Sequence, residues 1–428
     1  MLKVGLISLG CAKNLVDSET ILGLLKHDGY TITSSINNSD IIIVNTCGFI
    51  DSSKKESIET IFEMLSHGKK VVVTGCLAQR YEEELKKEIP EAFFIPIHDY
   101  NCFNELFQQI DKDLNKSGGL DDHYRMISTG NYSAYLKIGE GCDNCCSYCA
   151  IPLIRGHFVS RKYDDIIEEA KQLADSGIKE VIVLEQDTTK YGIDTNDDHN
   201  IVSLLKGLLE IKKLDYIRLL YLYPDEITDD LIELIAKEKR LTSYFDIPIQ
   251  HSEDHILKDM NRRGNKEYLS KLFNKIKSKV PNAILRTTVM VGFPGETEED
   301  VDNLISFMEE IEFDHLGAFT YSREEGTKSY DFPSQIDEKT KKNRLDRVMK
   351  VQQSISYRKN KKHIGEIMEG LVVGKEKEHY LLRSYWNAPD DVDGKIFFKS
   401  SKELKEGDIV KVLIEQAYVY DLMGILKE

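Results

Sequence analysis

Three closely spaced cysteines constrain this chain more than any other feature of its sequence. Cys142, Cys146 and Cys149 stand at the spacing C-x3-C-x2-C, with Cys145 between them as a spare thiol. A loop wound that tightly can direct three thiolates toward one side of a cubane iron–sulfur cluster, for which thiolates are natural ligands. Three ligands for four irons leave one iron open to bind another molecule. Structural zinc usually takes four ligands, and neither a second C-x2-C pair nor a suitable histidine follows this loop.

Three further cysteines follow predicted strands of the first segment, residues 1–115. Short apolar strands alternate there with amphipathic helices, which predicts a small parallel sheet with helices on its faces. Cys11, Cys47 and Cys76 each follow a strand and stand beside a glycine, whereas Cys102 does not and is interpreted as structural. Because parallel strands end at one edge of a sheet, we expect the three thiols to converge and hold a second cluster; three unrelated buried cysteines are the alternative. The predicted strands are 4–8, 40–44 and 70–74, and the predicted helices are 17–27, 53–66 and 79–87.

The middle of the chain repeats a strand–helix pattern six times. A polar, glycine-bearing passage at 116–132 predicts a linker, and 133–362 predicts an open, partial (β/α)6 barrel without a closing seventh and eighth unit. Polar residues follow each strand, which places the chemistry at the carboxyl ends of the strands. The predicted strands are 134–138, 180–184, 216–222, 244–249, 283–291 and 315–321, and the predicted helices are 163–176, 201–211, 228–238, 266–278, 298–311 and 338–359.

The last segment, 363–428, consists of short strand-like runs of alternating residues that are separated by glycine-containing turns. This pattern predicts a small five-stranded antiparallel β-barrel. Tyr385, Trp386 and Tyr418 are candidates for a recognition surface, or equally for the core of this barrel. The predicted strands are 366–373, 379–383, 395–398, 409–415 and 419–426.

Charge and composition limit the partners of this 428-residue chain. With 41% hydrophobic and 30% charged residues it has the composition of an ordinary globular protein, with no apolar run of membrane-spanning length and no signal-peptide pattern at its start. Clustered thiols fit a reducing compartment, so we expect a cytoplasmic protein. The formal charge of −16 favours a basic protein or a small molecule over nucleic acid, although a local basic groove could be hidden by the average.

The cysteine loop, with Tyr148 just before its last cysteine, resembles that of the radical S-adenosylmethionine (SAM) enzymes. Together with the three-cysteine first segment and the small last barrel, called a TRAM domain in that family, essentially the whole chain resembles the methylthiotransferases. Three runs resemble the branch that modifies an aspartate of the small-subunit ribosomal protein at the decoding centre. They are SLGCAKN at 8–14, QDTT at 186–189, and NAPDDVDG at 387–394, where Asn387 and an extra acidic residue depart from the branch pattern.

The resemblance implies two [4Fe-4S] clusters and SAM as cofactors. Cys11, Cys47 and Cys76 would hold an auxiliary cluster that carries the sulfur, and Cys142, Cys146 and Cys149 the cluster that cleaves SAM. A first SAM would methylate the sulfur. The radical from a second would remove a hydrogen from the aspartate β-carbon, where the methylthio group then adds. That hydrogen is not acidic enough for a base, so no side chain is assigned a catalytic acid–base role.

SAM should bind at the rim of the partial barrel. Its ammonium, carboxylate, ribose and adenine require acceptors, a cation and apolar walls. Gln186 and Asp187 would accept from the ammonium or the ribose, and Arg286 would pair with the carboxylate. Gly292 would allow close approach beside the adenine, with Phe293 as a wall, and Tyr148 would add a contact from the cysteine loop.

We expect a basic small-subunit ribosomal protein as substrate and a low-potential electron donor such as flavodoxin or ferredoxin. Contact with nucleic acid would be secondary. The nearest alternative is a tRNA adenosine methylthiotransferase with the same two clusters, which a more basic last barrel would favour. A non-catalytic iron–sulfur or RNA-binding protein is a more distant alternative, and failure to cleave SAM would support it.

Overall fold

The computed structural model describes residues 2–114, 116–121, 124–389 and 392–427. Asp390 and Asp391 of the run at 387–394 lie outside this description. The chain forms two compact units. The first comprises 1–128, 139–159 and 322–330, and the second comprises 129–138, 160–321 and 331–428. The cysteine loop and the segment 322–330, which the sequence assigned to the barrel, therefore pack with the N-terminal segment.

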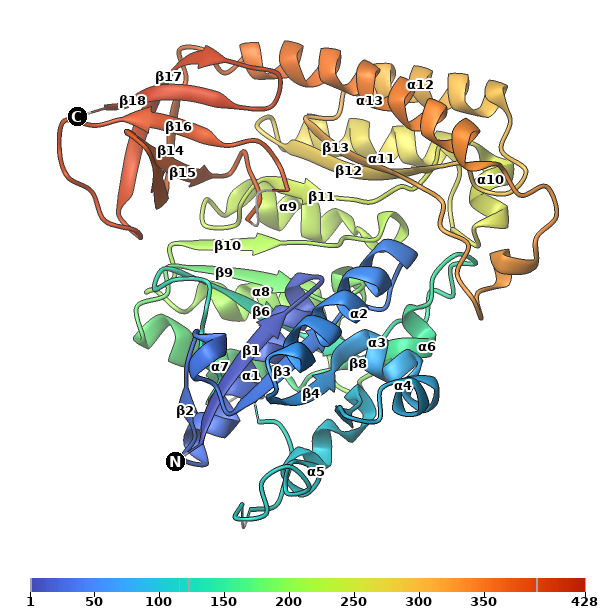
Figure 1. Ribbon diagram of the computed structural model, residues 1–428. Helices are drawn as coiled ribbons and strands as arrows, with labels where there is room; N and C mark the ends of the chain where they lie inside the picture. The colour runs from blue at the N-terminus through green and yellow to red at the C-terminus, as the bar shows by residue number, and fades with distance from the viewer. Residues whose placement is uncertain (1, 115, 122–123, 390–391, 428) are drawn as a thin grey trace. The chain divides into compact units, whose positions relative to one another are not determined.

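The first unit is a five-stranded parallel sheet in the order β2-β1-β3-β4-β5 (Figure 1). Its strands are β1 (Lys3–Ser8), β2 (Thr31–Ile32), β3 (Ile41–Thr46), β4 (Lys70–Thr74) and β5 (Phe93–Ile95). Its helices are α1 (Ala12–His27), α2 (Asp51–Ser66), α3 (Gly75–Arg80), α4 (Glu82–Glu88), α5 (Phe103–Phe107) and α6 (Ile151–Arg155), with short 3-10 turns at Ile36–Asn38 and Ile97–Cys102.

Alternation along the central strand explains why both faces of this sheet are covered. Ile41 and Ile43 pack in one apolar cluster with residues of α1 and α5, whereas Ile42 and Val44 pack in another with residues of α2. Successive side chains of a strand point to opposite faces, and a parallel sheet covered on both faces reads as a continuous apolar run. The run Ile41–Val44 is such a sequence, and all four residues are fully buried.

The passage predicted as a linker is held against helix α1. Arg125 pairs with Glu19 at 2.6 Å, and the Ser128 hydroxyl donates to the same carboxylate at 2.6 Å. The Met126 amide donates to the Glu19 carbonyl at 3.0 Å. Residues 125–128 are therefore an ordered part of the first unit.

The second unit begins with six parallel strands in two groups, β10-β9-β6 and β11-β12-β13. β10 and β11 belong to different sheets, which fits an open partial barrel. The Leu222 amide, three residues beyond β10, donates to the Asp246 carbonyl at 2.9 Å. The strands are β6 (Ser133–Lys137), β9 (Glu180–Leu184), β10 (Tyr216–Leu219), β11 (Tyr244–Asp246), β12 (Ile284–Val291) and β13 (His315–Thr320). The helices are α7 (Tyr163–Asp175), α8 (Ile201–Leu209), α9 (Asp229–Lys237), α10 (Asp254–Asp259), α11 (Lys266–Lys279), α12 (Glu298–Ile311) and α13 (Glu338–Lys361). In the first unit, the short strand β7 (Gly139–Glu140) precedes the cysteine loop and pairs with β8 (Val159–Ser160), which begins at the last residue of the unit's segment 139–159.

The C-terminal segment (red in Figure 1) closes into a barrel in the order β14-β15-β16-β18-β17. Its strands β16 and β18 run parallel, so the prediction of a purely antiparallel barrel is wrong at this closure. Trp386 is fully buried and its carbonyl contacts His315 Nε2 at 2.7 Å, so this aromatic belongs to the core and not to a recognition surface. The strands are β14 (Ile367–Glu376), β15 (His379–Ser384), β16 (Ile396–Lys399), β17 (Ile409–Ala417) and β18 (Leu422–Lys427).

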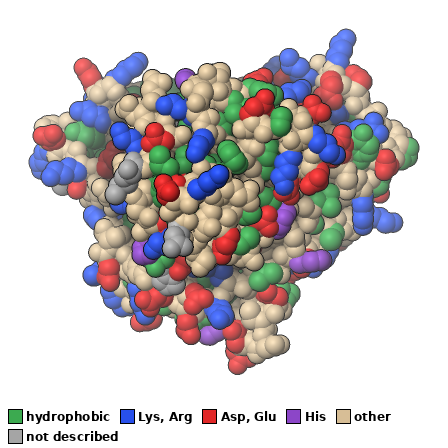
Figure 2. All heavy atoms as spheres, turned by 60° about the horizontal axis from the view of Figure 1, so that its bottom comes forward, with side chains coloured by type: hydrophobic (Ala, Val, Ile, Leu, Met, Phe, Trp, Pro, Cys, Tyr) green, Lys and Arg blue, Asp and Glu red, His purple; other side chains and the backbone are tan. Residues whose placement is uncertain are grey.

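The surface carries charges of both signs. On the face drawn in Figure 2, Lys and Arg side chains are interspersed with Asp and Glu side chains and form no single basic patch among the coloured residues. Within the described ranges, no helix combines the length and apolar character that crossing a bilayer requires.

A buried charge triad joins the C-terminal barrel to the strands of the second unit. Glu180 on β9 pairs with Arg218 on β10 at 3.0 Å and with Arg383 on β15 at 2.7 Å. All three side chains are at most 9% exposed. Burial opposes the charged form of Glu180, but the two guanidinium groups outweigh it and lower the pKa of its carboxyl.

Glu180→Gln should therefore destabilise the second unit strongly, because two buried arginines lose their counter-charge. Removing one member of a buried pair costs about 3–5 kcal/mol. Urea unfolding followed by circular dichroism at pH 7 would measure the loss. Glu233→Gln, which breaks an exposed pair with Lys279, is the control and should leave the midpoint unchanged.

The stability difference between the native chain and Glu180→Gln should depend on pH. A carboxyl with a lowered folded-state pKa stabilises the protein above the ordinary glutamate pKa and loses that contribution as the pH falls through the folded-state value. The stability difference between the native chain and Glu180→Gln should thus be largest above about pH 5 and shrink below about pH 4. A difference that grows on acidification would contradict the assignment.

Candidate functional site

The sheet of the first unit brings three cysteines to one edge. Cys11 is the N-cap of α1 after β1, Cys47 follows β3, and Cys76 lies in the first turn of α3 after β4. Burial raises the pKa of Cys76 to about 11, Arg155 opposes this rise, and the charges of Cys11 and Cys47 add to it. Burial likewise raises the pKa of Cys47, with a contribution from Cys11. The three cysteines thus follow strands that end at the same edge of the sheet, and the pKa of Cys76 responds to both other thiols.

Glycines allow the backbone segments that carry these thiols to pack closely together. A Cβ on Gly10, which has φ +92°, would lie 3.2 Å from Cys47 Sγ. A Cβ on Gly75, with φ +87°, would lie 2.1 Å from Asn45 Oδ1, and one on Gly48 would lie 2.8 Å from the Leu77 amide nitrogen. Only glycine fits these positions. An all-thiol donor set on a backbone this close is suited to an iron–sulfur cluster.

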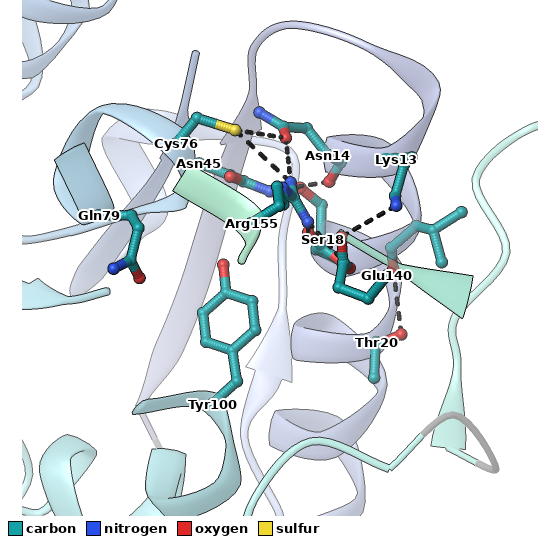
Figure 3. A network of polar contacts seen from close by, with 12 residues as sticks. Lys13, Asn14, Ser18, Thr20, Asn45, Cys76, Gln79, Tyr100, Glu140 and Arg155 are labelled. Atoms are coloured by element: carbon teal, nitrogen blue, oxygen red, sulfur yellow. Dashed lines mark hydrogen bonds and ion pairs between the residues drawn. The ribbon is translucent and has the colours of Figure 1, made fainter. Parts of the chain in front are cut away.

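A buried amide organises this edge (Figure 3). Asn14 Nδ2 donates to the carbonyls of Leu9 at 2.9 Å and Thr46 at 3.0 Å, so it ties together the turns that carry Cys11 and Cys47. Its Oδ1 accepts from Cys76 Sγ at 3.4 Å. Asn14 is fully buried, and sequence reasoning did not assign it a role. Its place three residues after Cys11, within the run at 8–14, is the signal that could have found it.

The cysteine loop belongs to the same unit. Gly141, with φ +79°, could not carry a Cβ because that atom would lie 2.0 Å from the His157 carbonyl oxygen. The Cys142 amide donates to the Gly156 carbonyl at 3.1 Å, and the Cys149 amide to the Cys146 carbonyl at 3.0 Å. These bonds wind the loop tightly and leave Cys145 exposed, while the three motif cysteines are partly buried.

A salt bridge joins this loop to helix α1. Lys13, which is 2% exposed, pairs with Glu140 at 2.9 Å, directly before the glycine that opens the loop. Ser147 is also fixed, because its carbonyl accepts from the Ser329 amide at 2.9 Å. Both cysteine sets are therefore supported by one framework, within the first unit. Tyr148, predicted to contact SAM, lies in this loop and is partly buried.

In the second unit, polar groups gather at the strand ends. Asp187 follows β9, is fully buried and accepts from the Thr189 hydroxyl at 2.5 Å, while its neighbour Gln186 is partly buried. Burial raises the pKa of Asp225, Arg263 lowers it, and the charge of Asp187 is among the groups that raise it. Asp187 also lies 4.0 Å from Lys190 Nζ, so this buried carboxylate has a cation beside it at the rim.

The loop after β12 is anchored by one carboxylate. Glu296 Oε1 accepts from the Gly292 amide at 2.8 Å and pairs with Arg344 at 2.8 Å. Glu296 Oε2 lies 3.5 Å from His251 Nε2, and both side chains are fully buried. Phe293 is fully buried against Tyr321, with ring centroids 5.4 Å apart. The loop predicted to lie beside the adenine is therefore rigidly held.

Arg286 does not fit its predicted role. It lies near the start of β12, whereas Gly292 follows the end of that strand. Its guanidinium pairs with Asp246 at 2.6 Å and with Asp393 of the C-terminal segment at 3.4 Å. Arg286 is thus neutralised by two carboxylates and holds the C-terminal segment against the strands. This contradicts the prediction that it pairs with the SAM carboxylate.

Comparisons with known proteins agree with this arrangement. Residues 3–95 match the uncharacterized protein family UPF0004, 136–308 the radical SAM superfamily, and 364–426 the TRAM domain. The ribosomal protein uS12 methylthiotransferase RimO of Thermoanaerobacter sp. (strain X514) is 46% identical over 99% of this chain and 100% of its own length. The same enzyme of Pelotomaculum thermopropionicum is 47% identical over 99% of each chain. This chain belongs to the ribosomal protein uS12 methylthiotransferase family.

The assignment makes the chain a radical SAM transferase, and it confirms the predictions of the family, of SAM with iron–sulfur chemistry, and of a TRAM domain. Solved structures agree on the fold alone. The radical SAM methyltransferase TsrM from Kitasatospora setae has a TM-score of 0.55 at 14% identity, covering 74% of this chain and 72% of its own. The cobalamin-dependent enzyme OxsB has a TM-score of 0.53 at 12% identity, covering 83% and 56%.

Gly75→Ala should abolish cluster binding at the sheet edge, because the new methyl group would overlap Asn45 and the backbone of Thr46. Iron per chain after anaerobic reconstitution should fall by roughly half if each cysteine set holds one four-iron cluster. Gly68→Ala is the matched control, since Gly68 also has a positive φ, +66°, but nothing lies within 4 Å of its added Cβ. Equal iron losses in both variants would show backbone strain and not crowding as the cause.

Proposed function

We propose that this enzyme adds a methylthio group to the β-carbon of one aspartate of ribosomal protein uS12. The observation that carries the proposal is the presence of two three-cysteine sets in a chain that matches uS12 methylthiotransferases along its whole length. Cys11, Cys47 and Cys76 hold one four-iron cluster in this proposal. The loop cysteines 142, 146 and 149 hold the other.

The remaining residues bind and orient. When bound, one cluster supplies the electron that cleaves SAM and the other supplies the sulfur that is methylated and transferred. Asp187 and Gln186 accept hydrogen bonds from the ammonium or ribose of SAM. In the second unit, the loop of Gly292 and Phe293 borders the proposed SAM site, and in the first unit Tyr148 lies in the cysteine loop. Glu296 keeps the Gly292 amide in place by accepting its hydrogen bond.

The acidic surface suits a basic protein substrate. The net charge is −16, and a phosphate backbone would be repelled by such a chain unless a basic groove compensated for it. We propose that the enzyme works in the cytoplasm, where its thiols stay reduced. A low-potential electron donor such as flavodoxin or ferredoxin supplies electrons to its clusters in this proposal.

Two cysteine variants should separate the two half-reactions. Replacing Cys142, Cys146 and Cys149 by alanine should abolish 5′-deoxyadenosine formation. Replacing Cys11, Cys47 and Cys76 should leave SAM cleavage intact but abolish the methylthio mass gain on uS12. Chromatography of the nucleoside products and mass spectrometry of uS12 would measure both, after anaerobic reconstitution with SAM and reductant.

Cys145→Ala and Cys102→Ala are the controls and should retain both activities. A methylthio group on tRNA instead of uS12 would overturn the substrate and keep the reaction class. Absence of 5′-deoxyadenosine with the native chain would overturn the radical reaction itself.

A further inference from the structure

Arg155 links the two cysteine sets of the first unit. It is the last residue of α6, the short helix that begins two residues after Cys149, and its side chain is 1% exposed. Its guanidinium pairs with Asp17 at 2.7 Å. It also pairs with Glu140 at 3.2 Å (Figure 3). Its Nη2 donates to Asn14 Oδ1 at 2.6 Å and to Cys76 Sγ at 3.6 Å.

The contact with sulfur is not needed to balance charge. Asp17 and Glu140 supply two negative charges, and Lys13, which pairs with Glu140 at 2.9 Å, supplies the second positive charge beside Arg155. The four charged groups are therefore neutral among themselves. A guanidinium presents its donors in a fixed fork, so one arm can bind carboxylate while another reaches the sulfur.

Cys76 Sγ has two polar neighbours, Asn14 Oδ1 at 3.4 Å and Arg155 Nη2 at 3.6 Å. As a thiol, Cys76 donates to Asn14 Oδ1 at 3.4 Å. As a metal ligand it is a thiolate and has no proton to donate, so this contact is lost as a hydrogen bond. Arg155 Nη2 remains as a donor, and hydrogen bonds from a cation to an anion are stronger than neutral ones.

The surroundings of this contact are buried. Cys76 packs in one apolar cluster with Ala150 and Ile154, and Ile97 borders it. Ala150 and Ile154 come from the same stretch as Arg155, directly after the cysteine loop. In such surroundings, hydrogen bonds and charges near the sulfur ligands have a large effect on the reduction potential of an iron–sulfur cluster.

We propose that Arg155 is a positioning residue that donates a hydrogen bond to the Cys76 sulfur, raises the reduction potential of the cluster at the sheet edge, and fixes helix α6 against it. The inference rests on the proposed function only in that Cys11, Cys47 and Cys76 hold a cluster. Stabilising electron density on the sulfur favours the reduced state. Loss of the donor should therefore make the cluster harder to reduce.

The test uses the full-length chain with Cys142, Cys146 and Cys149 replaced by alanine, so that only the sheet-edge cluster is loaded. Redox titration followed by electron paramagnetic resonance measures its potential in this parent and after Arg155→Gln. The expected result is a shift to a more negative potential. An unchanged potential would overturn the proposal.

Arg125→Gln is the matched control, because Arg125 is also buried and pairs with a carboxylate of α1, Glu19, at 2.6 Å. Arg125→Gln should leave the reduction potential of the cluster equal to that of the parent. A shift as large as that of Arg155→Gln would also overturn the proposal. If Arg155→Gln fails to load iron, Arg155→Lys decides, since lysine keeps the charge but lacks the fork. A negative shift in Arg155→Lys supports the proposal, and no shift overturns it.

Neither SAM nor substrate is present in this titration, so its outcome is independent of which molecule is methylthiolated. If the parent itself binds no iron, the cluster assignment fails and not the role of Arg155. In the chain with all its cysteines, Arg155→Gln should still cleave SAM and yield several-fold fewer methylthio transfers per 5′-deoxyadenosine. A ratio of methylthio transfers to 5′-deoxyadenosine equal to that of the native chain would contradict a role of Arg155 in sulfur transfer.

Discussion

Six polar side chains buried along helix α1 are the constraint on which the first unit depends. Lys13, Asn14, Asp17, Ser18, Glu19 and Thr20 are all at most 2% exposed. Buried polar groups are costly unless they are paired, so each one specifies a neighbour. Asn14 fixes the turns that carry two of the cysteines, and Glu19 orders residues 125–128. Lys13 and Asp17 hold the segment that contains the other three cysteines.

Buried polar pairs also fix the packing of the second unit. The C-terminal barrel meets the parallel strands through buried ion pairs, Glu180 with Arg218 and Arg383, and Arg286 with Asp246 and Asp393. Charged contacts are directional, and an apolar interface of the same area would tolerate sliding more easily. Glu180 is the first residue of β9 and Arg286 the third of β12, which leaves the carboxyl ends of these two strands, followed by Asp187 and Gly292, for chemistry.

Features that depend on the local pattern of apolar and polar residues could be predicted from the sequence. Strand and helix periods located β1, β3 and β4 and the six parallel strands of the second unit, whereas the short strands β2 and β5 were not predicted and α1 begins five residues before its predicted start. Parallel topology then placed Cys11, Cys47 and Cys76 at one edge. Pairings between distant polar residues leave no such pattern. Arg155 and Asp17 are 138 residues apart, so neither could be assigned a role, and Arg286 was assigned by its charge alone. The parallel closure of β16 on β18 and the burial of Trp386 were likewise decided by tertiary packing.

The most direct test of radical chemistry on uS12 is isotope transfer from the substrate. With uS12 carrying deuterium at the β-carbon of its aspartates, the native enzyme should produce 5′-deoxyadenosine that contains deuterium, detected by mass spectrometry, together with methylthiolated uS12. Unlabelled 5′-deoxyadenosine beside modified uS12 would contradict hydrogen removal from that carbon. Labelled product without any methylthio group would place the failure in sulfur transfer.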